Sequence, residues 1–321
     1  MGEKFNWGEH HISPDGGVEL AGYNLYRELG EAQSYCTLIA KSHYENFVIS
    51  NWFTPKEIKQ HIENIYAFCR YGDDLGDEAP FSAEGRLELL QAWEDDLEEA
   101  AREEWNGNPR HPILKAIQIT SRKYNIPHLP YWKLIQAFKM DQKKNRYSTW
   151  EELKKYCSYS ADPVGHLFLY VYGHDEEELR LISDNTCTAL QLANHWQDVA
   201  RDWAENRSYI PQETMDKYGL TWEQYGECVA TDSWVNVLRD EVIRAQELFD
   251  AGKILWQRVN PHLAVDLMMF TKGGEAILKS IRKQRYDTWT KRPTVSKFKH
   301  IILLFRAKRA WARAEKSARR A

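Results

Sequence analysis

Two acidic segments with helical spacing contain the residues of this chain that could do chemistry. In the first, Asp198 and Asp202 are four residues apart, and Asn194 lies four residues before Asp198. Side chains four apart on a helix share one face, so these three form a polar stripe, with Gln191 one turn earlier. Two carboxylates on one face repel each other, and a repeated stripe of this kind therefore suggests a bound cation.

The second acidic segment lies upstream. Asp73 and Asp77 are again four apart, with Arg70 three residues before Asp73 and Tyr66 four before Arg70. Either segment alone is equally well explained as a solvated acidic face. Both together favour Mg²⁺, because carboxylate oxygens suit this ion, which commonly bridges them to substrate phosphates. The sequence therefore predicts two facing Asp helices with hard cations and a phosphorylated ligand between them.

Two other acidic features are less specific. Asp74 lies three residues before Asp77, and its position fits either a partner of the ligand residues or a solvated side chain. The run Trp93–Glu99 has contiguous charges that occupy all sides of a helix rather than one stripe. We interpret that run as a solvent-exposed face.

The composition is that of a reduced, globular protein. Of the 321 residues, 43% are hydrophobic, which is enough for a sizeable core. The five cysteines are scattered and form no CxxC pair, as is typical of thiols in a reducing compartment. The N-terminal residues have no apolar leader, and no apolar run approaches the length of a membrane span. We therefore expect a cytoplasmic protein.

The C-terminal residues 291–321 carry eleven Lys and Arg against one acidic residue, although the whole chain has a net charge of −4. Their pattern predicts a basic amphipathic helix that binds anionic lipid, which would place the protein at the inner face of the cell membrane. The alternative is docking of this tail on the protein's own acidic body. No nucleic-acid-binding motif is present, so we expect no nucleic acid partner.

Helical periodicity runs through most of the chain, with no alternating strand and no glycine-rich nucleotide loop. The predicted fold class is all-α, with an irregular lead-in at 1–17, one helical domain at 18–290 and the basic tail at 291–321. Thr54-Pro55 predicts a helix start with Thr54 as N-cap. Pro163 and Gly165 interrupt an apolar helix, and they predict either a bend or a break between two helices.

From roughly Ser42 to Arg292 the chain resembles the squalene and phytoene synthase family. The similarity lies in three motifs, the last of them extended: Tyr66-x-x-x-Arg70-x-x-Asp73-Asp-x-x-Asp77, Tyr156-Cys-x-x-Ser-Ala-x-x-Val-Gly165, and Gln191-x-x-Asn194-x-x-x-Asp198-x-x-x-Asp202 followed by Arg207-x-Tyr-Ile-Pro211. The resemblance implies a single-domain isoprenoid synthase helical bundle with a central cavity. It also implies that Mg²⁺ is held against a prenyl diphosphate by Asp73, Asp77, Asn194, Asp198 and Asp202.

The third motif points to one branch of that family. Condensing members usually read Asn-Ile-Leu-Arg-Asp-x-x-Glu-Asp, whereas this chain reads Asn-His-Trp-Gln-Asp-Val-Ala-Arg-Asp, with Gln197 in the Arg place and Arg201 in the Glu place. Together with Glu45-Asn-Phe47 and Lys291-Arg-Pro-Thr-Val-Ser-Lys297, this resembles the hydroxysqualene synthases of the bacterial hopanoid-squalene pathway. Such a carbon–oxygen lyase takes presqualene diphosphate from a sister enzyme, adds water and passes the alcohol to another sister enzyme, without NADPH.

The resemblance assigns roles to further residues. The catalytic residues would be Asp73, Asp77, Asp198, Asp202, Tyr66 and Arg70. The substrate-binding residues would be Asn46, Phe47, Tyr66, Arg70, Tyr156, Gln191, Asn194, Gln197, Tyr286 and Arg292. Phe68 is a further aromatic candidate for stabilising a carbocation, with plain core packing as its alternative. We expect Gln197 to help hold a water, and His195 and Trp196 to point away from the Asp face as structural residues.

Three other functions fit the same motifs. A condensing prenyltransferase would make presqualene diphosphate, squalene or phytoene with the same Mg²⁺ site. A phosphohydrolase could use paired Asp helices on soluble nucleotides, but the chain has no nucleotide-phosphate loop. A non-catalytic helical subunit of a membrane-bound synthase complex would not need the four motif aspartates, all of which are present.

Overall fold

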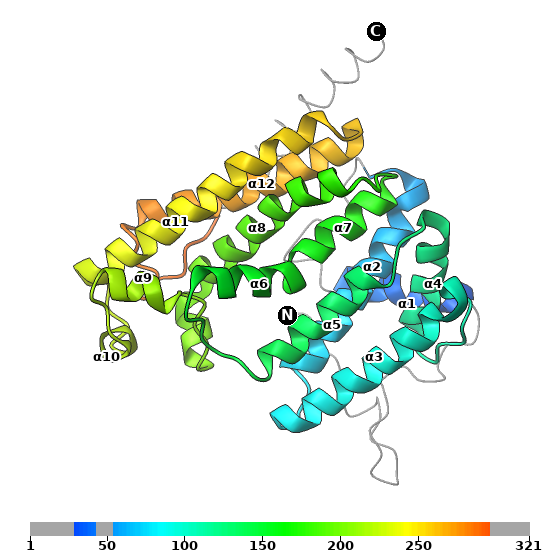
Figure 1. Cartoon of the computed structure of the whole chain (residues 1–321), viewed down its shortest axis with the longest axis horizontal. Coiled ribbons are helices and arrows are strands. Elements are labelled where there is room, and N and C mark those ends of the chain that lie inside the picture. Colours follow the sequence, from blue (N-terminus) through cyan, green and yellow to red (C-terminus); the bar gives the residue numbers. More distant parts are fainter. Residues whose placement is uncertain (1–28, 43–53, 296–321) are drawn as a thin grey trace, which may run out of the picture. The chain divides into compact units, whose positions relative to one another are not determined.

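The computed structural model describes residues 29–42 and 54–295, and in these ranges the chain forms helices and loops without a β-strand (Figure 1). The all-α prediction is confirmed. The predicted lead-in at 1–17 and the amphipathic helix of the tail lie outside the described residues, and the domain limits remain predictions. Within the described ranges, no helix combines the length and the apolar character needed to cross a membrane.

The chain divides into two compact units and passes between them after Lys143, after Gly165 within α7 (Asp162–Val171), and after His174. Unit 1 comprises the chain up to Lys143 together with residues 166–174. Its described helices before Lys143 are α1 (Leu29–Ser42), α2 (Lys56–Asp77), α3 (Ala83–Trp105), α4 (Pro112–Tyr124) and α5 (Leu129–Asp141). Unit 2 holds residues 144–165 and the chain from Asp175; its helices are α6 (Trp150–Ser160), α8 (Glu177–Ala204), α9 (Gln212–Lys217), α10 (Trp222–Gly226), α11 (Asp232–Gly252), the 3₁₀-helix η1 (Lys253–Gln257) and α12 (Pro261–Lys283).

Helix α2 carries the first acidic motif. Its N-cap is Pro55, which has extended backbone angles (φ −53°, ψ 137°), so the prediction of Thr54 as N-cap is wrong by one residue. Ile58, Ile62 and Ile65 recur at helical spacing and are buried, which holds this helix against α1 and α4. The apolar side of α2 therefore fixes which residues of the motif remain accessible.

A glycine in α2 allows α5 to approach closely. A Cβ atom at Gly72 would lie 2.5 Å from Cε2 of Phe138, so no larger residue fits without displacing that ring. One turn later, the carbonyl of Gly76 accepts hydrogen bonds from Arg86 (2.9 Å) and Gln142 (3.0 Å). These contacts hold the end of α2 where its aspartates lie.

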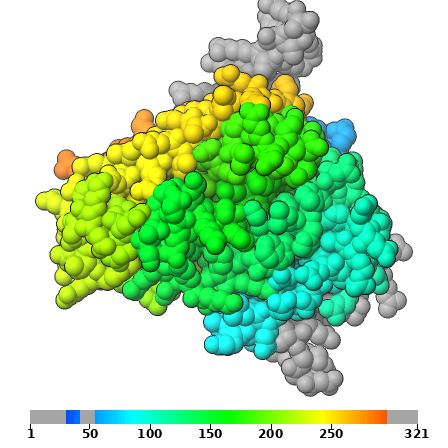
Figure 2. Space-filling view, in the orientation of Figure 1, coloured from blue at the N-terminus to red at the C-terminus, as the bar shows by residue number. Residues whose placement is uncertain are grey.

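Helix α8 carries the second acidic motif and packs along α11 and α12 (Figure 1). Its buried side includes Leu192, Ala193 and Trp196, and the indole nitrogen of Trp196 donates a hydrogen bond to the carbonyl of Glu241 (3.2 Å). The space-filling view shows the side chains of α11 as a continuous yellow band, with the orange side chains of α12 at its edge (Figure 2). The polar stripe of α8 is thus fixed by burial of the opposite side.

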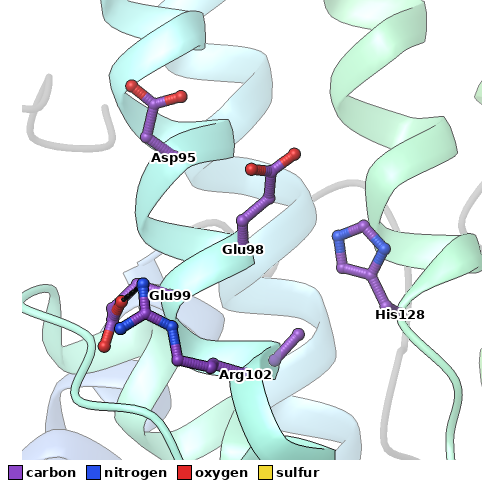
Figure 3. Close-up of a pocket in the computed structure, with 6 residues that line it drawn as sticks. Asp95, Glu98, Glu99, Arg102 and His128 are labelled. Atoms are coloured by element: carbon purple, nitrogen blue, oxygen red, sulfur yellow. Dashed lines mark ion pairs between the residues drawn. The ribbon is translucent and has the colours of Figure 1, made fainter.

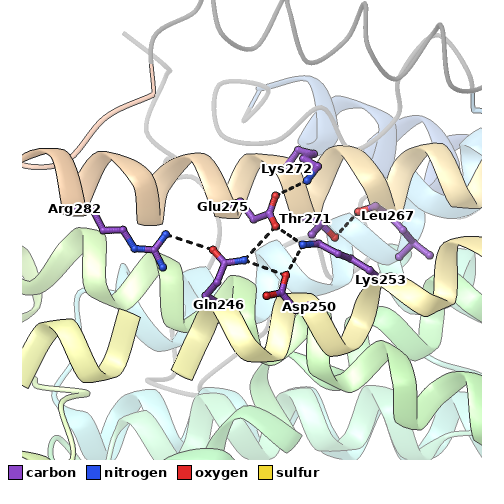
Figure 4. Close-up of polar contacts among 8 residues, drawn as sticks. All are labelled: Gln246, Asp250, Lys253, Leu267, Thr271, Lys272, Glu275 and Arg282. Carbon is purple, nitrogen blue, oxygen red and sulfur yellow. Dashed lines mark hydrogen bonds and ion pairs between the residues drawn. The ribbon is translucent and has the colours of Figure 1, made fainter. Parts of the chain in front are cut away.

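A polar network joins α11, η1 and α12 (Figure 4). The carboxylate of Glu275 on α12 contacts Lys253 Nζ (2.7 Å) and Lys272 Nζ (2.6 Å), and it accepts a hydrogen bond from Gln246 Nε2 (3.2 Å). Glu275 thus has polar partners on α11, η1 and α12 itself, and these contacts limit sliding of α12 along α11. They support the surface on which α8 packs.

The apolar helix is broken into α6 and α7 rather than bent, and the break falls at Ala161, so that Pro163 and Gly165 lie in the first turn of α7. Gly165 lies against α8, and a Cβ atom there would come within 2.5 Å of the sulfur of Cys187. Asp162, at the start of α7, accepts a hydrogen bond from the hydroxyl of Thr188 on α8 (2.8 Å). The central sequence motif therefore serves close packing of this segment on the site helix.

Replacing Gly165 by valine should lower the free energy of unfolding by about 1–3 kcal/mol, the usual cost of overpacking. The matched control is Gly273→Ala on α12, where a Cβ atom would meet nothing within 4 Å. That change should be neutral or stabilising by up to about 1 kcal/mol, because alanine favours a helix. Urea denaturation followed by circular dichroism measures both. Equal stabilities of the two variants would contradict the close contact at Gly165.

Candidate active site

Arg70 is the centre of the first acidic motif. Its Nη1 lies 3.2 Å from Oδ2 of Asp73, and its Nη2 contacts Oδ1 of Asp74 and lies 2.7 Å from Oε1 of Glu78. The side chain of Asp74 is only 4% exposed, whereas that of Asp73 is 47% exposed. Asp74 is therefore the buried counter-charge of Arg70 and not a solvated residue, which settles the alternative left open by the sequence.

Asp73 and Asp77 present carboxylates on the accessible side of the same helix. Desolvation of its carboxyl group raises the pKa of Asp73 to about 6, although 47% of the side chain surface is exposed. The charge of Arg70 opposes this shift, and the charge of Asp77 adds to it. Burial also raises the pKa of Tyr66, which therefore stays a neutral phenol one turn before Arg70. Repulsion of this kind between neighbouring carboxylates is what a bound cation relieves.

The second acidic motif is paired with a residue from the C-terminal part of the chain. Arg292 binds Asp198 with two guanidinium nitrogens, and its Nη2 lies 2.8 Å from Oδ2. Arg201 approaches the same carboxylate at 3.7 Å. The side chains of Asp198 and Asp202 are each 24% exposed. Arg292 thus lies at the aspartate face of α8 within unit 2, and its contact with a substrate phosphate stays a prediction.

Residues 284–295, here called the C-terminal segment, lie against α8, α11 and α12. Gln197 is buried and donates a hydrogen bond from Nε2 to the carbonyl of Pro293 (2.5 Å). Trp234 donates to the carbonyl of Tyr286 (3.0 Å), and Ser280 donates to that of Thr294 (3.1 Å). The amide of Gln197 therefore binds the segment that carries Arg292. Its expected part in holding a water stays a prediction.

His195 lies on the aspartate face of α8, so the prediction that it points away is wrong. Its Nε2 is 3.1 Å from Nε2 of Gln191, and its Nδ1 is 3.9 Å from Oδ2 of Asp202. Positions 195 and 202 are seven apart, which is two helical turns and hence the same face. Burial lowers the pKa of His195 to about 3, and the charge of Arg207 contributes, so the imidazole is neutral. The prediction for Trp196 is confirmed, since that side chain is fully buried.

Three tyrosines form an aromatic wall beside His195. The ring of Tyr209 stacks on the imidazole at 3.5 Å between centroids, and Tyr156 lies 5.7 Å from Tyr209. Tyr147 completes the group at 5.4 Å from Tyr156. Only Tyr156 was predicted for the site. Tyr209 could have been found, because it belongs to the sequence that follows the third motif.

The remaining predicted residues are dispersed. Phe68 is fully buried between Trp93 and Tyr131, so its core-packing alternative holds. The ring of Tyr286 packs beneath the guanidinium of Arg239 on α11, at 5.5 Å. Asn194 is partly exposed on α8, one turn before Asp198. The predicted substrate-binding residues Asn46 and Phe47 lie outside the described residues.

The acidic run in α3 is only partly solvated, contrary to the prediction. Asp96 is 1% exposed and accepts hydrogen bonds from the backbone N–H groups of Arg110 and His111, both at 2.8 Å. Glu94 is also buried and accepts from the indole of Trp132 (2.8 Å). The exposed members border a hollow on unit 1 that contains no predicted site residue (Figure 3); it is lined by Asp95, Glu98, Glu99, Ala101, Arg102 and His128.

The chemistry of the two Asp pairs fits Mg²⁺. This ion usually takes one or two protein carboxylates, keeps several waters and completes its shell with substrate phosphates. Each helix offers such a pair, Asp73 with Asp77 and Asp198 with Asp202, at accessible positions. In residues 29–42 and 54–295, no three His, Cys, Asp or Glu side chains are grouped so as to hold an ion by themselves.

Residues 40–299 match the squalene/phytoene synthase family, and the chain belongs to that family. Among solved structures, the squalene synthase HpnC from Alicyclobacillus acidocaldarius is 42% identical, with a TM-score of 0.75 over 80% of this chain and 95% of that one. The hydroxysqualene synthase of Zymomonas mobilis is 28% identical over 264 residues, which cover 81% of this chain and 86% of that protein. A phytoene synthase from Cucumis melo is 29% identical over 304 residues, 92% of this chain and 70% of the relative.

These comparisons confirm the predicted family and its helical isoprenoid synthase fold. A dehydrosqualene synthase structure, 22% identical, has a TM-score of 0.79 over 88% of this chain and 97% of that one, which supports the fold. The family consists of prenyltransferase-like synthases. The two Asp motifs, Arg70 and the Arg292–Asp198 pair are therefore the candidate active-site features of an enzyme of this family.

Replacing Arg70 by glutamine should destabilise the protein by roughly 3 kcal/mol, because Asp74 would remain buried without its counter-charge. Adding Asp74→Asn should recover most of this loss, since the unpaired charge is then removed. Urea denaturation of the two single variants and the double variant measures the coupling.

The matched control is Arg102→Gln. Arg102 is 66% exposed and pairs with Glu99 three residues earlier, at 2.7 Å. An exposed pair of this kind contributes about 1 kcal/mol or less. Equal effects of Arg70→Gln and Arg102→Gln would show that the buried pair has no special part in stability.

Proposed function

We propose that this enzyme converts presqualene diphosphate and water to hydroxysqualene and diphosphate, with Mg²⁺ as cofactor. The observation that carries the proposal is the environment of Gln197. At the place where condensing members have Arg, this chain has a buried amide bonded to the carbonyl of Pro293. That position can therefore not supply a cation to a second diphosphate, which a condensing enzyme must accommodate.

Condensation and hydration share their first step and differ in the nucleophile. Both ionise a prenyl diphosphate, so both need the four motif aspartates. Afterwards an alkene captures the cation in condensation, and a water captures it in hydration. The residues that depart from the condensing pattern lie on α8, beside Asp198 and Asp202. The similarity to a hydroxysqualene synthase supports hydration.

The leaving group must be stabilised as the carbon–oxygen bond breaks and its electron pair departs with the diphosphate. Bound Mg²⁺ would supply Lewis-acid neutralisation of this charge, held by Asp73, Asp77, Asp198 and Asp202. Arg70 and Arg292 can donate charge-assisted hydrogen bonds to phosphate oxygens. For Arg292, this means that its guanidinium exchanges Asp198 for the substrate.

The carbocation requires an aromatic surface with little water. The wall of Tyr147, Tyr156 and Tyr209 offers π faces, which attract positive charge without acting as nucleophiles. After rearrangement of the cyclopropylcarbinyl cation, the oxygen of one water forms the new carbon–oxygen bond. One proton of that water is released, so presqualene diphosphate and water balance with hydroxysqualene, diphosphate and a proton.

The C30 substrate and product are strongly apolar, which gives a reason for a membrane-surface location. We include in the proposal that the basic residues after Lys291 attach the enzyme to anionic lipid at the cytoplasmic side. There it would receive presqualene diphosphate from a condensing sister enzyme and pass the alcohol to a reductive one.

A condensing activity is the second candidate, because the chain also matches phytoene synthases over most of its length. The two candidates are separated by the substrate. We expect presqualene diphosphate with Mg²⁺ and no NADPH to yield a C30 alcohol, and farnesyl diphosphate alone to yield nothing. Mass spectrometry of the extracted products and a diphosphate-release assay measure this. Conversion of farnesyl diphosphate to presqualene diphosphate would reject the proposed function.

Chelation of Mg²⁺ should abolish diphosphate release, and the variants Asp73→Asn and Asp198→Asn should each lose roughly 100-fold or more in kcat. The control is Asp95→Asn in the hollow of α3, which should retain wild-type turnover. Retained activity of the two motif variants would contradict the assignment of these aspartates.

Arg292→Ala should have opposite effects on metal binding and on turnover. Without Arg292, Asp198 loses a competing cation, so Mg²⁺ should bind the substrate-free enzyme about fivefold more tightly, the equivalent of roughly 1 kcal/mol for a partly exposed pair. Turnover should fall roughly 100-fold through loss of a phosphate ligand. Isothermal titration and steady-state kinetics measure the two effects.

The control for Arg292→Ala is Arg282→Ala at the end of α12, where the guanidinium bonds Gln246 at 3.5 Å (Figure 4). That variant should change neither quantity. Weaker Mg²⁺ binding in Arg292→Ala would show that Arg292 supports the metal site instead of competing with it.

A further inference from the structure

His195 is a largely buried polar residue on the aspartate face of α8. An aliphatic side chain there would keep the face of α8 apolar between its polar turns. The imidazole instead aligns with Gln191 and Asp202, which lie four residues before it and seven after it. The side chain of His195 is 10% exposed, and its ring is held face to face by Tyr209, with an interplanar angle of 15°. Its two nitrogens therefore have fixed directions.

The neighbours of the two ring nitrogens define their roles. An amide nitrogen can only donate, so the contact of 3.1 Å between Gln191 Nε2 and His195 Nε2 makes the latter an acceptor. The ring proton then lies on Nδ1, by inference from this hydrogen-bond partner. Nδ1 is directed toward Asp202, with 3.9 Å between Nδ1 and Oδ2. That distance exceeds a hydrogen bond but can be bridged by one water.

We propose that His195 and Asp202 hold the water that captures the carbocation. The inference rests on the proposed function and adds the residues that select the nucleophile. A water between these groups accepts a hydrogen bond from Nδ1–H and donates one to the carboxylate of Asp202. One lone pair remains on its oxygen, and that pair can attack the cation.

The reaction step balances with these partners. The water oxygen forms the bond to carbon with its remaining lone pair. One O–H bond then breaks, its electrons stay on the alcohol oxygen, and the proton passes to the departing diphosphate. His195 keeps its proton throughout, and its only role is to orient the water through the hydrogen bond from Nδ1–H. The rings of Tyr209 and Tyr156 lie beside His195 and offer this water no further hydrogen bond through their faces, so its position decides where the hydroxyl group forms.

The same geometry predicts what an aliphatic residue at position 195 would do. Isoleucine at position 195 would offer no hydrogen bond, and a water beside it would lose a partner in an apolar cavity. The carbocation would then have no water within reach, and it would react with an alkene or a reductant instead. A single polar side chain, oriented by Gln191 and stacked on Tyr209, is sufficient to admit water at one point.

The test is the share of alcohol among the products of the full-length enzyme with presqualene diphosphate and Mg²⁺. In His195→Ile the amount of C30 alcohol per diphosphate released should fall about tenfold or more, the effect of losing one to two hydrogen bonds. Hydrocarbon from proton loss should take its place. His195→Gln keeps a donor and should retain most of the alcohol. Oxygen-18 water and mass spectrometry report the origin of the hydroxyl oxygen.

Gln191→Leu is a second variant, for use if His195→Ile does not fold. It leaves the imidazole in place but removes the partner of Nε2, so the alcohol share should fall as well. Asn185→Ala is the control: Asn185 lies on α8 and donates only to backbone carbonyls of its own helix, at 3.2 and 3.3 Å. That variant should give the wild-type product ratio.

The outcomes separate this inference from the proposed function. If the wild-type enzyme does not consume presqualene diphosphate, the proposed function itself fails. If the wild type makes hydroxysqualene and the His195→Ile and Gln191→Leu variants give an unchanged alcohol share, the function stands and the role of His195 is overturned. A purely structural histidine would alter the melting temperature and leave the product ratio constant.

Discussion

Electrostatic repulsion between carboxylates on one helical face is the constraint on which the site depends. Helices α2 and α8 each place two aspartates four residues apart, an arrangement that is unfavourable without a cation. The chain itself supplies arginines to both: Arg70 binds Asp73 and Asp74 within α2, and Arg292 from the C-terminal segment binds Asp198, which Arg201 also approaches. Arg70 lies on the same helix as its partners, whereas Arg292 lies in the segment that follows α12. This difference is the reason for proposing ligand exchange for Arg292 and a structural role for the pair of Arg70 and Asp74.

Packing of the opposite, apolar sides of α2 and α8 fixes the rotation of each helix about its axis, and with it the direction of the acidic face. In α2, Gly72 admits Phe138 so closely that the helix cannot rotate without a clash. In α8, Trp196 is buried and bonded to the carbonyl of Glu241. A rotation of either helix would expose large apolar side chains, at a cost of about 1.5–3 kcal/mol for each. Burial of the apolar sides therefore offsets the unfavourable repulsion between the aspartates and keeps them on the accessible face.

The sequence predicted the helices that carry the aspartates well, because helical spacing is a local property. It failed where a partner comes from far along the chain. Gln197 binds Pro293, which lies 96 residues later, and no local pattern contains that contact. Asp96 appeared solvated because its partners, the N–H groups of Arg110 and His111, lie across a turn. The misassignment of His195 is of another kind, since its spacing of seven from Asp202 was visible in the sequence.

If His195 holds the attacking water, as we propose, little of the fold must change for a new reaction outcome. Ionisation of a prenyl diphosphate requires charge, which in the proposed function comes from the four motif aspartates with Mg²⁺ and from the arginines. Capture of the cation requires only that one nucleophile lie nearest when the charge forms. In an apolar cavity a water needs two or more hydrogen-bond partners to remain. A polar side chain on one turn of α8, next to an aspartate already present for the metal, supplies the missing partner. Hydration can therefore arise from the condensing framework by substitution within a single helical turn, without altering the helices that hold the diphosphate.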